Sequence, residues 1–222
     1  MIIKPLPRVK ICCIANIEEA RLAIKYGASA VGLVSEMPSG PGPIPEELIE
    51  EIAALIPPGV SSFLLTSKQD VDSIITQQKR TKVNTIQIVD KLIYGSHTDL
   101  KKALPGISIV QVIHVHSEES FKEAVEVAPF VNAILLDSGN QSFKIKELGG
   151  TGRVHDWNIS RKIVDSVNVP VFLAGGLTPD NIIDAVNKVN PYGLDICSGV
   201  RTNGKLDEEK LALLFNNLKK LH

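Results

Sequence analysis

The chain has 222 residues, of which 44% are hydrophobic and 22% charged, and 24 lysines and arginines against 25 aspartates and glutamates leave a net charge of -1. This composition is that of an ordinary folded protein and excludes a disordered tail, a collagen-like repeat and a charge-driven coil. The balanced charge gives no bulk attraction to nucleic acid or to an acidic membrane, so we expect neither as a partner.

Short runs rich in valine, isoleucine and leucine alternate with longer amphipathic stretches along the chain. Most of the short runs are apolar on both faces, which is typical of parallel strands covered on both sides. In chain order the predicted strands are 9–14, 30–35, 61–66, 85–89, 108–114, 132–137, 169–174 and 193–198. The predicted helices are 17–26, 45–55, 68–78, 98–103, 117–128, 158–167, 179–189 and 208–221.

Several helix starts carry capping signals. Asn16, with Glu19 three residues later, predicts a capping box at the first helix. Ser117, Thr178 and Asp207 are predicted N-caps of later helices, because their side chains can accept a hydrogen bond from the first turn.

Eight strands, each followed by a helix, are the pattern of a (β/α)8 TIM barrel. We therefore expect residues 1–222 to form a single barrel domain. An open doubly wound sheet is the alternative. A unit spacing of roughly 25 residues and the absence of a GxGxxG motif after the first strand favour the barrel.

Two reactive side chains lie where a barrel carries its function, at the carboxyl ends of strands. Asp137 ends the sixth predicted strand, where shielding from water suits a general acid; the alternative is an N-cap or a salt-bridge partner. Cys12 is a candidate base or nucleophile near the end of the first strand, and the alternative is a small core residue. Because side chains alternate along a strand, we expect only one of Cys12 and Cys13 to point into the barrel mouth.

Glycine-rich turns follow the last three predicted strands. Backbone N–H groups in such turns can bind an anion, and the loops after strands seven and eight are the usual phosphate site of a barrel. The alternative is that the glycines only permit tight turns, but two successive units with the same device favour phosphate binding. The glycines are Gly149, Gly150 and Gly152 after the sixth strand, Gly175 and Gly176 after the seventh, and Gly199 after the eighth.

Cysteine usage and apolar runs bear on the compartment. Three cysteines without a CxxC motif indicate free thiols of a reducing compartment, so we expect a cytoplasmic protein. The first residues lack the apolar stretch of a signal peptide, and no run is long enough to cross a membrane. His114 and His116 share one face at the end of the fifth strand but have no evident third ligand, so we expect no metal.

Taken together, five motifs resemble the phosphoribosylanthranilate isomerase family of tryptophan biosynthesis. They occur in the family's order from Lys10 to the end of the chain. The motifs are Lys10-Ile11-Cys12, LLD ending at Asp137, GGTG followed by a basic residue and then Asp156-Trp157, LAGGL-x-P-x-N, and YGLD-x-x-SGV.

The resemblance implies an Amadori isomerase that converts N-(5-phosphoribosyl)anthranilate to 1-(2-carboxyphenylamino)-1-deoxyribulose 5-phosphate. It implies that Asp137 is the general acid that opens the furanose ring and that Cys12 is the general base that removes the C2 proton. An acid and a base suffice for this chemistry, so no cofactor is implied; the partner is a phosphorylated sugar, and the oligomeric state stays open. The substrate- and phosphate-binding residues implied are Gly150, Gly152, Arg153, Gly175, Gly176, Asp195, Ser198 and Gly199.

The chain departs from the family pattern at several positions. Pro41 stands where the family has an arginine that pairs with the anthranilate carboxylate, and proline offers neither charge nor donor. Cys13 replaces a glycine, and Cys197 replaces a serine near the phosphate. The QLHG motif of strand four reads QIVD, and Arg153 replaces a lysine with its charge kept.

Loss of a charge-assisted contact of the Pro41 kind costs about 1.5–3 kcal/mol of binding. Either another cation binds the carboxylate, with Arg153 and Arg201 as candidates, or the amine is not anthranilate. The alternative functions are a related barrel isomerase of another phosphorylated aminosugar and a non-catalytic phosphosugar-binding paralogue. The presence of both Cys12 and Asp137 argues against the paralogue, because a binding protein needs neither.

Overall fold

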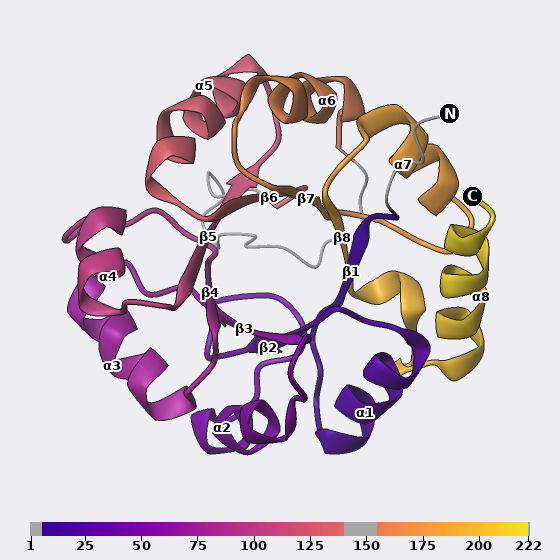
Figure 1. Cartoon of the computed structure of the whole chain (residues 1–222), viewed down its shortest axis with the longest axis horizontal. Coiled ribbons are helices and arrows are strands. Elements are labelled where there is room, and N and C mark those ends of the chain that lie inside the picture. Colours follow the sequence, from indigo (N-terminus) through magenta and orange to yellow (C-terminus); the bar gives the residue numbers. More distant parts are fainter. Residues whose placement is uncertain (1–5, 140–154, 222) are drawn as a thin grey trace.

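The computed structural model describes residues 6–139 and 155–221 of the chain. In this part of the chain, eight parallel strands pair in sequence order and close into a barrel, because the last strand also pairs with the first. The helices surround the barrel as an outer ring (Figure 1). The predicted (β/α)8 barrel is therefore confirmed, and the open doubly wound sheet is excluded.

The strands and helices occupy the predicted segments, with ends that differ by up to three residues. The barrel strands are β1 (Arg8–Ile11), β2 (Ala30–Val34), β3 (Ser61–Thr66), β4 (Thr85–Ile88), β5 (Ser108–His114), β6 (Ala133–Asp137), β7 (Val171–Leu173) and β8 (Gly193–Ile196). The α-helices are α1 (Ile17–Tyr26), α2 (Glu46–Leu55), α3 (Val71–Thr81), α4 (His97–Ala103), α5 (Glu118–Val127), α6 (Trp157–Ser166), α7 (Ile182–Val189) and α8 (Glu208–Lys219).

Apolar side chains fill both faces of the strands, which explains why the strand sequences do not alternate. One cluster lies inside the barrel and includes Phe63 and Phe172, whose rings meet edge to face at 5.9 Å. The larger cluster lies between the strands and the helices and includes Ile11, Leu33 and Ile134, all fully buried. The helices thus cover the outer face of every strand, and the barrel interior is packed rather than open.

The first helix is capped differently from the prediction. The Asn16 side chain accepts a hydrogen bond from the Glu19 N–H at 2.8 Å, as expected. The Glu19 carboxylate, however, accepts from the N–H of Ala15 and from Arg201 instead of closing a capping box on Asn16. The predicted box is therefore only half formed, because an arginine from the far end of the chain takes the carboxylate.

Of the other predicted N-caps, two are confirmed and one is wrong. Ser117 caps α5 and Asp207 caps α8. At α7 the N-cap is Asn181, and its side-chain oxygen accepts a hydrogen bond from the Thr178 N–H at 2.9 Å. The segment before α7 therefore forms a turn held by Asn181, and the helix begins three residues later than predicted.

A short antiparallel hairpin follows β8 and was not predicted. Its strands are β9 (Arg201–Thr202) and β10 (Lys205–Leu206). The two residues between them, Asn203 and Gly204, have φ angles of 51° and 78°. Asn-Gly is the preferred pair for a two-residue hairpin turn, because both positions need a left-handed backbone. This hairpin positions Arg201 beside the end of β1.

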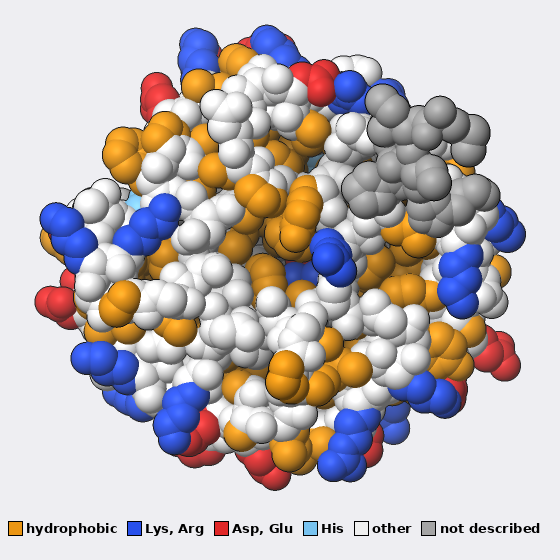
Figure 2. Space-filling view, viewed as in Figure 1, with side chains coloured by type: hydrophobic (Ala, Val, Ile, Leu, Met, Phe, Trp, Pro, Cys, Tyr) orange, Lys and Arg blue, Asp and Glu red, His pale blue; other side chains and the backbone are white. Residues whose placement is uncertain are grey.

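Charged side chains of both signs are interspersed around the face of the molecule in Figure 2, without a single-sign patch over the centre. None of the helices in the described part of the chain is long and apolar enough to cross a membrane.

Candidate functional site

A cavity opens at the carboxyl ends of the strands, the end of the barrel at which we expect the site. Residues that directly follow β1, β7 and β8 contribute to its wall, together with the last residue of β6 and the loop after β2. The predicted site residues that line it are Cys12, Asp137, Gly175, Gly176, Asp195 and Ser198. Side chains far apart in sequence thus meet around one space that a small ligand can enter.

Cys12 directly follows β1 and is buried, with 5% of its surface exposed. Its backbone N–H donates to the Ile196 carbonyl at 2.8 Å, which ties it to β8. Its Sγ lies 3.4 Å from the Nζ of Lys10. The thiol therefore faces the cavity and has a cationic side chain beside it.

Lys10 forms an ion pair with Asp195 inside the barrel. The two residues are register partners on β1 and β8, and Nζ lies 2.8 Å from Oδ1 with the lysine side chain fully buried. Burial opposes the charge, but the Asp195 carboxylate and the Cys12 thiol outweigh it and raise the pKa of Lys10. Burial also raises the pKa of Asp195, although the Lys10 charge lowers it, and this effect of burial disfavours the ion pair. Because the contact is short and each group stabilises the opposite charge of the other, we assign the charged pair.

Asp137 ends β6 with 9% of its surface exposed. Its Oδ1 accepts a hydrogen bond from the Ser138 N–H at 2.7 Å. The N-cap alternative does not hold, because Asp156 caps α6, the next helix in the described residues. His155, whose ring contacts Ser160 at 2.7 Å, lies close enough to interact with the Asp137 charge, but burial lowers the His155 pKa to about 4 and keeps the ring neutral.

The glycine turns after β7 and β8 differ in what they do. Gly175 and Gly176 line the cavity with φ angles of 81° and 62°, a left-handed backbone that suits glycine. Gly199 lies outside the lining, and a Cβ there would come within 2.0 Å of the Leu177 carbonyl oxygen. Gly199 therefore lets the loop after β8 approach the loop after β7, while Ser198 faces the cavity. The predicted Gly150, Gly152 and Arg153 lie outside the described residues.

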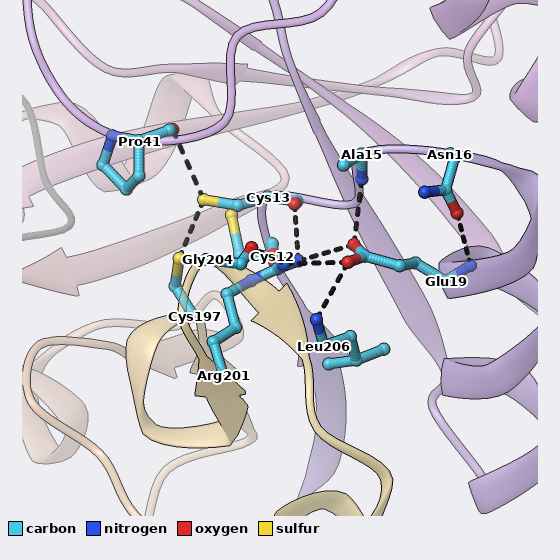
Figure 3. A network of polar contacts seen from close by, with 10 residues as sticks. All are labelled: Cys12, Cys13, Ala15, Asn16, Glu19, Pro41, Cys197, Arg201, Gly204 and Leu206. Carbon is cyan, nitrogen blue, oxygen red and sulfur yellow. Dashed lines mark hydrogen bonds and ion pairs between the residues drawn. The ribbon is translucent and has the colours of Figure 1, made fainter.

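Both Cys12 and Cys13 line the cavity, contrary to the expectation that only one would. The strand ends at Ile11, and Cys13 has a φ of 60°, so the alternation of side chains along a strand no longer applies. The Sγ of Cys13 lies 2.8 Å from that of Cys197 and 3.6 Å from the Pro41 carbonyl oxygen (Figure 3).

Arg201, one of the two candidates for binding the substrate carboxylate, is not available for that role. Its guanidinium contacts both carboxylate oxygens of Glu19, at 3.1 and 2.9 Å, and donates to the backbone carbonyls of Cys12 and Cys13 (Figure 3). With 8% of its side chain exposed, it acts as a clamp on the turn after β1.

The wall around Pro41 carries no replacement for the family arginine: neither lysine nor arginine is among the described residues that line the cavity. Sequence reasoning gave no role to Gln87, which lines the cavity from β4 and is buried. Its Oε1 has no hydrogen-bond partner in the described structure. A glutamine inside the apolar run TIQIV was the available signal.

The chain matches one family model and relatives with the same name over most of its length. Residues 9–217 match the family described as N-(5'phosphoribosyl)anthranilate (PRA) isomerase. The chain is 37% identical over 206 residues to N-(5'-phosphoribosyl)anthranilate isomerase 2 of Methanosarcina mazei, covering 92% of this chain and 90% of the relative. It is 33% identical over 211 residues to the isomerase of Haloferax volcanii, covering 95% and 91%.

Solved structures of similar proteins agree with these relatives. The crystal structure of phosphoribosyl anthranilate isomerase from Thermotoga maritima superposes with a TM-score of 0.81 at 28% identity, over 96% of this chain and 99% of that one. A second isomerase structure, in complex with reduced 1-(o-carboxyphenylamino)-1-deoxyribulose 5-phosphate, superposes with a TM-score of 0.78 at 26% identity and the same coverage.

Proposed function

The chain belongs to the N-(5'-phosphoribosyl)anthranilate isomerase family, and we propose that it performs the isomerisation with Cys12 as general base and Asp137 as general acid. The reaction converts an aminoaldose to an aminoketose in tryptophan biosynthesis. The observation that carries the residue assignment is that the thiol and the carboxyl group line one cavity although they come from opposite halves of the sequence.

In the first step, Asp137 protonates the furanose ring oxygen of the substrate. The C1–O bond then breaks as the amine nitrogen donates its lone pair to C1, so that an open-chain Schiff base forms. The Ser138 N–H holds one carboxylate oxygen at 2.7 Å, which supports a fixed orientation of the acid. Placement of the carboxyl group at a strand end also keeps it on a rigid element.

In the second step, the Cys12 thiolate removes the proton on C2. The electron pair of that C–H bond moves toward the Schiff-base nitrogen and gives an enolamine, which tautomerises to the ketone. The Lys10 ammonium lies 3.4 Å from the Cys12 sulfur, so its positive charge stabilises the thiolate. The Arg201 clamp on the Cys12 and Cys13 carbonyls supports a fixed position of the base.

The phosphate of the substrate binds in this proposal to the turns at Gly175-Gly176 and at Ser198, with Gly150, Gly152 and Arg153 completing the site. The phosphorylated ligand in the related crystal structure supports a ligand of this class. The anthranilate carboxylate then faces the loop that contains Pro41. Since that loop contains neither lysine nor arginine, we infer that neutral donors bind the carboxylate there.

A cytoplasmic location is part of the proposal, because the three cysteines are free thiols and these persist in a reducing compartment.

Complementation of a tryptophan auxotroph that lacks this isomerase tests the function, and kinetics of the purified protein test the residues. We expect growth with the unmodified chain and none with Cys12→Ala or Asp137→Ala. A general acid or base typically increases the rate by about a hundredfold to ten-thousandfold, so the kcat of each variant should fall by at least about a hundredfold. Failure to complement by a folded protein that is stabilised by ribose phosphates would favour the isomerase of another aminosugar, and full activity of either variant would refute its assigned role.

A further inference from the structure

Two of the chain's departures from its family pattern, Cys13 and Cys197, meet in space. Their sulfur atoms lie 2.8 Å apart although the residues are 184 positions apart in the sequence (Figure 3). Both line the cavity beside Cys12 and are free thiols. A glycine and a serine at these positions would offer no such chemistry, whereas two cysteines can be oxidised to a disulfide.

The backbone arrangement suits a disulfide. Cys13 follows the end of β1 and Cys197 the end of β8, and these strands are paired. The register places Ile11 opposite Ile196, so the segments that carry Cys13 and Cys197 leave the barrel side by side. The left-handed backbone of Cys13, with φ of 60°, turns its thiol toward Cys197 instead of outward.

We propose that Cys13 and Cys197 form a reversible disulfide that switches off the enzyme; the loss of activity, though not the bond itself, rests on the proposed function. The oxidant is the disulfide of a small thiol, RSSR. The Cys197 thiolate attacks one sulfur of RSSR, forms a mixed disulfide and releases one RSH. The Cys13 thiolate then attacks the Cys197 sulfur and releases the second RSH, so two protein thiols are oxidised and one RSSR is reduced.

The two thiols have unequal environments that fit this order of attack. Cys197 is partly exposed, while Cys13 has 7% of its surface exposed. The hydrogen bond with Cys13, together with the nearby Arg201 charge, lowers the pKa of Cys197. Hydrogen bonds with Cys12 and Cys197, together with burial, raise the pKa of Cys13. The accessible thiol therefore reacts first with a small molecule, and the buried thiol resolves the mixed disulfide.

The bond would connect the two sides of the site. Cys13 directly follows the general base, and Cys197 directly precedes Ser198 in the phosphate-binding turn. A covalent link between them fixes both segments and moves the Cys13 sulfur away from its reduced position beside Cys12. We therefore expect the oxidised enzyme to lose most of its activity.

The test treats the full chain, first reduced and then freed of reductant, with oxidised glutathione, and blocks the remaining thiols by alkylation. We expect a mass about 2 Da lower than that of the reduced chain before alkylation, a Cys13–Cys197 peptide in the digest, and one thiol left to alkylate. Activity should fall and should return with dithiothreitol. Cys197→Ser removes the attacking thiol, so its activity before and after the treatment should stay nearly equal. The matched variant Cys13→Gly, which suits the positive φ, lacks the resolving thiol and should stop at a mixed disulfide on Cys197, with the mass of one glutathione added.

A disulfide that includes Cys12, or only stable mixed disulfides with glutathione, would overturn the proposal. A complete Cys13–Cys197 bond with unchanged activity would overturn its regulatory part. The mass measurement does not depend on catalysis, so a reduced protein without isomerase activity that still forms the bond would refute the proposed function and leave the disulfide standing. Thermal melts of both variants exclude misfolding as the cause of a missing bond.

Discussion

Replacing Lys10 by methionine tests the buried ion pair beside Cys12. The substitution keeps the length of the side chain and removes the ammonium that lies 2.8 Å from Asp195 and 3.4 Å from the Cys12 sulfur. Asp195 is then left in a site where 7% of its side chain is exposed, and no other lysine or arginine of the described residues forms an ion pair with it. Breaking a buried pair in this way costs about 3–5 kcal/mol, because the remaining charge loses its partner.

For a chain of this size, 3–5 kcal/mol corresponds to a fall of about 6–20 °C in Tm. Denaturant unfolding of the Lys10→Met, Asp195→Asn and double variants measures the effect. We expect the double variant to be at least about 1 kcal/mol more stable than the sum of the single effects, since the pair is broken only once. Additive losses, or a Lys10→Met loss below about 1 kcal/mol, would refute the ion pair.

The same variant should change its stability with pH. Without Lys10, burial raises the folded-state pKa of Asp195 further above the unfolded value. The folded state then binds the proton more tightly, so the loss of stability is largest at neutral pH and shrinks as the pH falls through the raised pKa. The variant should also lose about tenfold to a hundredfold in kcat, because the thiolate loses its neighbouring charge.

Three further substitutions test other contacts. Glu19→Gln removes the carboxylate that holds Arg201, at a cost of about 3 kcal/mol. Burial alone would raise the pKa of Glu19, but hydrogen bonds from Arg201, Leu206 and Ala15 lower it. The difference in Tm between the variant and the unmodified protein should therefore be largest above pH 4.5 and should disappear as the pH falls through the lowered pKa. Gly199→Ala places a methyl group against the Leu177 carbonyl, so the free energy of unfolding should fall by about 1–3 kcal/mol and KM should rise. An unchanged Tm would mean that the loops after β7 and β8 do not pack as described. Gln87→Leu removes a buried oxygen that has no hydrogen-bond partner among the described residues, so Tm should rise by the equivalent of about 1 kcal/mol. A lower Tm would show that the oxygen has a partner.

The sequence was a good guide to the fold because the signals of a barrel are local. Each strand is an apolar run and each helix an amphipathic one, so the order of elements followed from their spacing. The strand ends were predicted less well, because the backbone conformation at which a strand stops does not depend on how apolar the residues are. Cys13 is the clearest example: β1 stops two residues earlier, and the left-handed turn brings both thiols to the cavity.

Contacts between distant segments were beyond local signals. Arg201 was a candidate substrate ligand until its bonds to Glu19, 182 positions away, showed it to be structural. Lys10 was noted as part of a motif, but its pairing with Asp195 depends on the closure of β1 against β8. The Asn-Gly turn of the hairpin, by contrast, was readable from the sequence and was missed.

The clamp between Arg201 and the turn after β1 has a consequence for protein synthesis. The proposed base is residue 12, yet the strand that completes the barrel and the guanidinium that fixes the backbone of Cys12 lie at residues 193–196 and 201. A growing chain can form its early units in order as they leave the ribosome. The Cys12 thiol, however, remains unpositioned until β8 and Arg201 have been synthesised, so a fragment that stops before them lacks a working centre.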